Sequence, residues 1–391
     1  MTEPLKFQWC DRLGELPRED WNAIAQPLAT PFLEWDWLHD LEASGSVVAK
    51  AGWQACHLVV WRGDRLIAAA PLYLKGHSYG EFVFDQQWAD LAGRLGLRYY
   101  PKLLGMTPLT PAVGYRFLIA PSEDEAMLTG LMLREIDRFC ENNQILSCNF
   151  LYVDPDWQPL VEAAGYSAWQ HHNSVWQNHG FRTFDDYLGM FNANQRRNIK
   201  REVKSMERAG LELTCLSGDQ IPRDYFPLMY RFYSDHCDKF GWWGSKYLTR
   251  DFFDRAMHNS RHRLLFVAAT PEGSDRPIAM SFCVHKGDRL YGRYWGCDRE
   301  IDNLHFNVCY YKPIEWAIAN GIQSFDPGAG GSHKKRRGFP ATPNWSLHRW
   351  YQLRFGQILG SWLRQVNELE SQEIEAINAE LPFSRPDVPL S

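Results

Sequence analysis

A short stretch in the last fifth of the chain gathers residues suited to acid–base and anion chemistry. An apolar run at residues 322–325 predicts a strand, and Asp326 follows it at once. His333 precedes four consecutive cations at residues 334–337. Three glycines between them favour a turn: Gly328, Gly330 and Gly331. A carboxylate at a strand end, a turn and clustered cations can line a site for an anionic substrate, although a solvated basic turn fits the same pattern.

A second polar stretch lies in the first half of the chain, at residues 75–115. It mixes polar, aromatic, proline and glycine residues without a clear period. Long irregular segments in compact domains are often functional, but many only cover a core, and the sequence leaves both interpretations open. The candidates for contact with an acceptor molecule are His77, Tyr79, Glu81 and Asp85.

A basic helix is predicted near residues 192–209. Ile199, Val203 and Met206 fall on one face at helical spacing, so this face can dock while the cations remain outside. The cations that could extend an anion-binding surface are Arg196, Arg197 and Lys200. A solvated helix face and an RNA-binding surface are the alternatives, and the acidic first half of the chain argues against non-specific RNA or DNA binding.

These candidates require two α/β units to position them. In each half the pattern predicts a helix, a hairpin, a further strand, a helix and a strand. The first half has them near residues 17–45, 57–74, 128–142 and 145–153. The second half has them near residues 225–240, 264–284, 290–296, 303–320 and 322–325. The order predicts two copies of one unit, with domains at residues 1–178 and 179–391 and a Glu-rich C-terminal tail.

Charge and composition agree with two domains of different character. The chain has 391 residues and a net charge of −5. Residues 1–178 hold 13 Lys and Arg and 22 Asp and Glu, which leaves 29 cations and 25 anions for residues 179–391. Anion handling is therefore expected in the second half. A loop with Trp242 and Trp243 is expected to shape a local pocket.

Cysteine usage and hydropathy indicate a cytoplasmic protein. The nine Cys lie singly in apolar segments without a Cys-x-x-Cys pair, which favours reduced thiols and argues against a zinc site, so no metal is expected. The longest apolar run, residues 66–74, is far short of the roughly 20 residues of a spanning helix. Peripheral contact with a membrane stays compatible with the sequence.

Several motifs together resemble the Fem-type (FemAB-like) aminoacyltransferases. The basic segment 196–202 ahead of residues 210–213 is similar to their basic helix and strand, and the Asp326-Pro327-Gly328 segment with Gly338-Phe339 is similar to their Asp…Gly…Lys-x-Gly-Phe segment. A subfamily of predicted N-acyltransferases, known as peptidoglycan biosynthesis or recognition proteins, matches more closely. Its wording covers residues 71–85, 100–103, 247–250, 291–296 and 304–311, together with residues 331–334.

The resemblance implies two tandem acetyltransferase-type (GNAT-like) domains with mixed, mostly antiparallel sheets, the second carrying an acyl-transfer cleft. It implies a CoA thioester or an aminoacyl-tRNA as donor co-substrate, no tightly bound cofactor, and an amine acceptor that is a cell-envelope precursor or another small molecule. The chain departs from the pattern at Gly330-Gly331-Ser332, where a Gln-Gly-Glu-type run is expected, and it lacks a clear acyl-CoA motif. A binding module of the same fold, recognising a glycan, peptide or anionic lipid headgroup, is therefore the alternative.

In the resembling fold, donor and acceptor meet where two neighbouring strands part, here residues 290–296 and 322–325. Asp326 and His333 are the candidate bases, and Tyr294 is a candidate proton donor to the leaving group. The start of the helix at Asn303 and His305 could bind donor phosphates. The remaining donor-binding candidates are Arg293, Gly328, Gly330, Gly331, Lys334, Lys335 and Arg337.

Overall fold

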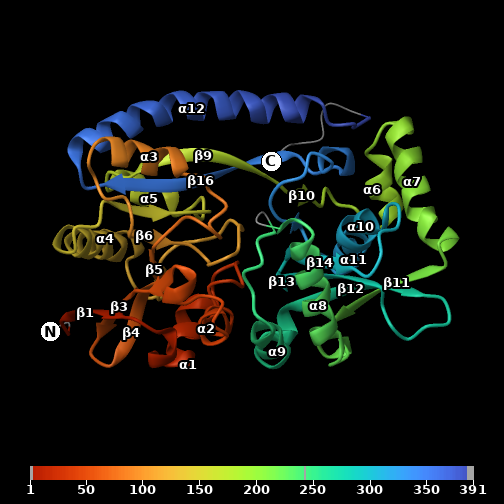
Figure 1. Cartoon of the computed structure of the whole chain (residues 1–391), viewed down its shortest axis with the longest axis horizontal. Helices are drawn as coiled ribbons and strands as arrows, with labels where there is room; N and C mark the ends of the chain where they lie inside the picture. The colour runs from red at the N-terminus through yellow and green to blue at the C-terminus, as the bar shows by residue number, and fades with distance from the viewer. Residues whose placement is uncertain (1–2, 242–243, 385–391) are drawn as a thin grey trace. The chain divides into compact units, whose positions relative to one another are not determined.

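The computed structural model describes residues 3–241 and 244–384, and the chain divides into two compact units. The first unit holds residues 1–172 and 343–372, and the second holds residues 173–342 and 373–391. The predicted boundary at residue 178 differs from this division, because residues 343–372 belong to the first unit. Figure 1 shows the reason: the blue strand β16 lies among the yellow strands of the first unit. Trp242 and Trp243, the predicted pocket loop, lie outside the described residues.

The first unit contains two sheets. The four-stranded sheet has the order β1 (Leu5–Cys10), β3 (His57–Arg62), β4 (Arg65–Ala70), β7 (Leu118–Ile119). The six-stranded sheet has the order β2 (Trp53–Ala55), β5 (Leu72–Lys75), β6 (Lys102–Gly105), β8 (Ser147–Phe150), β16 (Ala341–Trp350), β9 (Ser167–Ser174). The helices are α1 (Arg18–Ala25), α2 (Trp35–Ala43), α3 (Gln86–Arg94), α4 (Glu125–Asn142), α5 (Gln158–Ala163) and most of α12 (Leu353–Ala379).

The predicted hairpin is present, but its second apolar run is divided between the two sheets. Residues 66–74 form β4 and β5, which are separated by Pro71. Proline has no N–H for a sheet ladder, so the pairing of β4 with β3 ends there and β5 pairs with β6 instead. The core between sheet and helices is aromatic, with the ring of Trp157 against those of Phe117 and Phe150.

The second unit is built on one six-stranded sheet. Its order is β10 (Trp176–Gln177), β15 (Ser324–Asp326), β14 (Arg289–Cys297), β13 (Ala279–Lys286), β12 (Leu264–Pro271), β11 (Leu211–Ser217). The helices are α6 (Phe184–Gly189), α7 (Ala193–Arg208), α8 (Tyr225–Asp238), α9 (Arg250–Asn259), α10 (Leu304–Phe306) and α11 (Lys312–Ala319). Two further turns matter for the site: the π-helical turn η6 (Asn307–Tyr311) and the 3-10 turn η7 (Lys335–Arg337).

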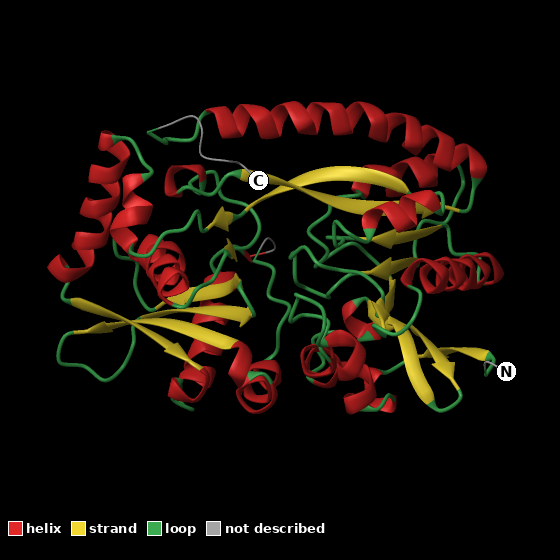
Figure 2. Ribbon diagram, turned by 180° about the vertical axis from the view of Figure 1, so that it is seen from behind, coloured by secondary structure: helices red, strands yellow, loops and turns green. Residues whose placement is uncertain are grey.

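Helices cover both faces of this sheet, as Figure 2 shows. Along β12, Leu265 packs into a core with residues of η6 and α11, while the neighbouring Phe266 lies against Phe226 of α8. Successive side chains of a strand point to opposite faces, so α11 and α8 cover different faces. The strands and helices predicted for this half are present, but the single helix expected at residues 303–320 is three pieces, α10, η6 and α11.

Close packing of α8 on β14 depends on one glycine. A Cβ atom at Gly296 would lie 2.1 Å from the carbonyl oxygen of Phe232 in α8. Real Cβ atoms do not approach a backbone oxygen so closely, so any larger residue must push α8 off the sheet.

We predict that Gly296→Ala destabilises the second unit by about 2 kcal/mol or more, because overpacking a core costs about 1–3 kcal/mol. The melting temperature should fall by roughly 4–8 °C for a unit of this size. Gly189→Ala is the matched control, since no atom lies within 4 Å of a Cβ there. Differential scanning calorimetry measures both, and equal melting temperatures for the two variants would contradict the packing described here.

Candidate functional site

The parallel pairing of β14 with β15 stops after three residues. Tyr291 pairs with Asp326 at the last position, and β14 then continues to Cys297 without β15. Pro327 ends the ladder, because it has no N–H to donate. On the other edge of β14, Phe282 pairs with Tyr294 and Cys283 with Gly292, so Arg293 is the extra residue of a β-bulge. A bulge and the end of a ladder therefore lie side by side on one strand.

Asp326 and Lys334 are both buried around Gly328. The Oδ1 atom of Asp326 accepts a hydrogen bond from the Gly328 N–H at 2.8 Å, and the Lys334 ammonium donates to the Gly328 carbonyl. Burial raises the pKa of Asp326, against the opposing charges of Arg293 and Lys334. Burial also lowers the pKa of Lys334 to about 8, although Asp326 opposes this shift. Both groups are therefore closer to neutrality than free side chains.

A glycine is required at the centre of this arrangement. Gly328 has a φ of 96°, and a Cβ atom there would lie 3.2 Å from the carbonyl oxygen of Gly292. Two further turn glycines, Gly330 and Gly331, have φ values of 71° and 91°. The predicted glycine turn is thus present, and it brings the backbone of β14 against the segment after β15.

His333 lies beside a tyrosine that sequence reasoning did not select. Its Nε2 atom is 2.9 Å from the hydroxyl of Tyr310, and the rings of His305 and Phe306 lie 5.6 and 5.4 Å from its own ring. Burial lowers the pKa of His333 to about 4 and that of His305 to about 3, so both imidazoles are neutral at pH 7. Tyr310 comes from the π-helical turn η6, a local irregularity that is frequent at functional sites.

Arg337 is already engaged by residues of its own unit. Its guanidinium lies 3.3 Å from the ring centre of Phe306, and donates to Glu202 at 2.8 Å and to the His333 carbonyl at 3.0 Å. The hydroxyl of Tyr311 also donates to Glu202. Arg337 therefore ties α7 to the segment that carries His333, and Glu202 was another residue not selected from the sequence.

Several predicted residues lie apart from Asp326. The ring of Tyr294 packs with those of Tyr233, Phe253 and Phe282, and burial raises its pKa to about 12. Asn303 donates to the Ser205 hydroxyl and precedes a helix of only three residues. This helix, α10, is too short for a phosphate site at its N-terminus.

The cations predicted to extend the site point in different directions. Lys335 pairs with Glu380 near the end of the described chain. On α7, Arg197 and Lys200 are exposed and Arg196 is half-buried. Lys200 lies 3.6 Å from Asp185 of α6. The contact of α7 with the η7 turn is made by Gln195, which donates to the Arg336 carbonyl at 2.6 Å. The binding roles of these cations stay predictions.

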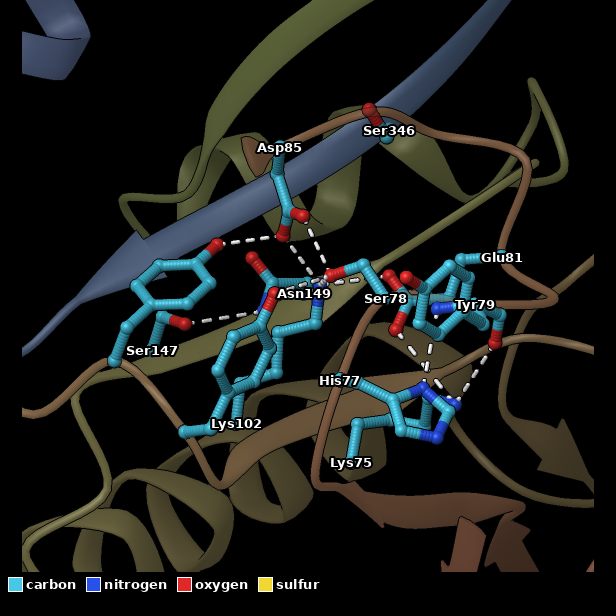
Figure 3. A network of polar contacts seen from close by, with 12 residues as sticks. Lys75, His77, Ser78, Tyr79, Glu81, Asp85, Lys102, Ser147, Asn149 and Ser346 are labelled. Carbon is cyan, nitrogen blue, oxygen red and sulfur yellow. Dashed lines mark hydrogen bonds and ion pairs between the residues drawn. The ribbon is translucent and has the colours of Figure 1, made fainter. Parts of the chain in front are cut away.

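The first unit contains a buried group of four ionisable side chains, which we call the four-charge cluster: Lys75, Glu81, Asp85 and Lys102 (Figure 3). The Lys102 ammonium donates to Glu81 at 2.7 Å and also to Asp85, and Glu81 lies 4.0 Å from Lys75. Burial lowers the pKa of Lys75 to about 7 and raises that of Glu81 to about 7. Burial also opposes charge on Lys102, but its two carboxylates outweigh this and raise its pKa.

Of the four acceptor candidates in the first half, two belong to this cluster and two lie outside it. Glu81 and Asp85 face the lysines, whereas Tyr79 is 67% exposed and its ring lies 5.0 Å from that of the half-buried His77. The two lysines were not selected from the sequence, although each adjoins a short apolar strand run. A lysine that continues such a run is the signal that could have found them, because lysine is rarely buried without a partner.

A neutral polar chain lies on the neighbouring strands of the same sheet. His348 Nδ1 is 2.8 Å from the Asn149 amide oxygen, and His348 Nε2 is 2.8 Å from the Ser346 hydroxyl. This order of serine, histidine and amide is the geometry of an activated nucleophile. All three side chains are almost fully buried, with Ser346 at 0% exposure, so the contacts join β8 to β16 and present no nucleophile to solvent.

Comparison with solved structures identifies the fold. FemX superimposes with a TM-score of 0.53 at 10% identity, over 90% of this chain and 100% of that chain. L-PGS from Bacillus licheniformis gives 0.50 at 10% identity, over 87% and 98% of the two chains. A conserved protein of unknown function from Bacteroides thetaiotaomicron gives 0.50 at 11% identity, over 88% and 99%. At these identities the likeness shows the fold alone, and no curated protein sequence matches the chain.

The predicted fold class is confirmed: the chain has two GNAT-like α/β units with mixed, mostly antiparallel sheets. Among the described residues, no helix is both long enough and apolar enough to cross a membrane. The predicted family resemblance is also confirmed, because a family profile for peptidoglycan biosynthesis or recognition matches residues 12–385. The chain, with its paired α/β units and its interrupted ladder at Asp326, belongs to the FemAB-like family.

Proposed function

We propose that this protein is an acyltransferase that moves an acyl or aminoacyl group from a CoA thioester or an aminoacyl-tRNA to an amine. The acceptor class that the family description favours is a cell-envelope precursor. One observation carries the proposal: the β14–β15 ladder ends where Asp326, Arg293 and Lys334 gather around Gly328. A carboxylate of raised pKa beside two cations supplies a base and charge stabilisation at one place.

The proposed chemistry forms a C–N bond and breaks the donor's C–S or C–O bond. Asp326 accepts the proton that the attacking amine releases, and its raised pKa suits this role. Lys334 and Arg293 stabilise the negative charge that develops on the carbonyl oxygen. The leaving thiolate or alkoxide takes a proton, for which Tyr310, held by His333, is better placed than Tyr294 in its aromatic cluster.

The alternative is a binding module that keeps the fold without the chemistry. The observation that favours it is the Gly330-Gly331-Ser332 sequence, which lacks the carboxylate expected before His333. Fold alone does not decide between the two functions.

We predict that the full-length protein is stabilised by an acyl donor. Thermal denaturation is measured with acetyl-CoA, longer acyl-CoAs, free CoA and charged tRNA, because a ligand that binds only the folded state raises the melting temperature. A rise with one donor class identifies the donor. No rise with any of them would contradict the acyltransferase proposal and favour the binding module.

For the donor so identified, we predict that Asp326→Asn and His333→Ala lower turnover much more than donor affinity. Removing a general base typically costs 10²–10⁴-fold in rate. Tyr310→Phe should lower turnover as well, whereas Tyr294→Phe should leave it nearly unchanged and serves as the matched control. Single-turnover kinetics separates chemistry from binding. Equal losses in turnover and affinity would assign Asp326 and His333 to binding instead.

The pKa of Lys334 predicts a pH dependence of donor binding. Its ammonium is charged below about pH 8 and loses its proton as the pH rises through that value. Affinity for an anionic donor should then fall roughly tenfold or more, since a hydrogen bond to a charged group contributes about 1.5–3 kcal/mol. Lys334→Arg should bind with little change between pH 7 and 9, because arginine stays protonated. Isothermal titration calorimetry measures both, and a parallel loss in the two proteins would exclude Lys334 as the cause.

A further inference from the structure

The four-charge cluster of the first unit divides its charges between two kinds of element. Both carboxylates come from the loop of residues 76–85, whereas Lys75 ends β5 and Lys102 begins β6. The two lysines face each other in the antiparallel register of these strands. Like charges directly opposite each other are unfavourable, and burial makes them more so. The strands therefore require an anion between the lysines, whichever molecule provides it.

Glu81 fills this place incompletely. Its Oε2 atom accepts from Lys102 at 2.7 Å, but its Oε1 atom is 4.0 Å from the Lys75 ammonium. Charge-assisted hydrogen bonds measure about 2.7–2.9 Å. Within the described part of the chain, Oε1 accepts no hydrogen bond, although Glu81 is only 1% exposed. A buried carboxylate oxygen without a donor is unfavourable, and a carboxylate free of the loop could contact both lysines.

Lys75 is held by weaker partners than Lys102. Its ammonium donates to the Tyr79 carbonyl at 3.1 Å and lies 3.5 Å from the ring centre of Trp53. Lys102, by contrast, contacts two carboxylates and the Ser78 hydroxyl. Figure 3 shows Lys75 and Lys102 approached from the same side by Ser78 and Glu81. The cation without a close anion is therefore Lys75.

The loop that supplies Glu81 is strained and lies at the surface. Gly80 and Phe82 have φ values of 80° and 59°, and the Phe82 carbonyl accepts a hydrogen bond from Tyr152, whose own φ is 54°. Left-handed backbone at non-glycine residues persists where the surroundings enforce it, often beside ligand sites. Tyr79 and Phe84 are 67% and 75% exposed, so the outer side of the loop meets solvent.

We propose that Lys75 and Lys102 form a binding site for a carboxylate-bearing ligand, and that Glu81 occupies the site when no ligand is bound. A free amino acid and the end of a peptide both offer this chemistry. Displacement needs only the Glu81 side chain to turn away, because Asp85 still holds Lys102 and accepts from the Ser78 and Tyr99 hydroxyls. The site lies in the first unit and stands whether or not the second unit transfers acyl groups.

Thermal denaturation of the full-length protein tests the proposal, with sodium acetate, glutarate, glycylglycine and inorganic phosphate as probes. Each is compared with sodium chloride at equal ionic strength. Carboxylates should raise the melting temperature of the wild type more than phosphate or chloride does. Lys75→Met should lose this rise, and Lys75→Arg should retain it. Glu81→Gln should respond at concentrations at least tenfold lower, because the competing carboxylate is gone. A larger response to glycylglycine than to acetate identifies the peptide end as the source.

The matched control is Glu141→Gln, which removes an exposed carboxylate of the same unit and should respond as the wild type does. A wild type without a carboxylate-specific rise, even if added acetate restores stability to Glu81→Ala, would assign the cluster to folding and overturn the proposal. An equal rise with phosphate would overturn the preference for carboxylates. Should Lys75→Met fail to fold, the responses of Lys75→Arg and Glu81→Gln decide. Acyl-CoA is absent from these measurements, so their failure leaves the proposed transfer reaction untouched.

Discussion

The second unit depends on the point at which a parallel ladder is forced to end. Pro327 cannot donate to β14, so pairing stops at Asp326, while β14 continues and bulges at Arg293. The segment after β15 must then turn closely past β14, which only a glycine at position 328 allows. The same turn carries Lys334 back onto the Gly328 carbonyl. Backbone geometry thus collects the charged side chains, and their chemistry follows from that placement.

The first unit has a related arrangement without the opening. Its strands β6 and β8 are also parallel, with α4 between them in the chain, as α10 and α11 lie between β14 and β15. Here, however, hydrogen bonding continues from the Gly105 carbonyl to the Leu151 N–H. A Cβ atom at Gly105 would lie 2.3 Å from the Tyr115 hydroxyl, so this region is filled. One architecture therefore produces an interrupted ladder in one unit and a packed one in the other.

Local pattern predicted the elements well and the long-range partners poorly. The strand before Asp326 and the glycine turn could be predicted, because apolar runs and glycines act over a few residues. The bulge at Arg293 could not, since it arises from the register of β13 against β14. Lys75 and Lys102 were missed for the same reason: each looks like a surface lysine until two distant strands pair. Strand β16 was missed because it belongs to a sheet formed by the other half of the chain.

Burial of charge gives the two groups of ionisable residues different properties. In the four-charge cluster, two lysines face two carboxylates, so charge is balanced but one carboxylate oxygen lacks a donor. Around Gly328, Lys334 and Arg293 face the single carboxylate of Asp326, so this region has an excess of positive charge. The cost of desolvating these cations is incurred on folding. Negative charge that develops later on a bound carbonyl oxygen would then meet cations already in place, which is the arrangement that stabilises a transition state more than a neutral ground state.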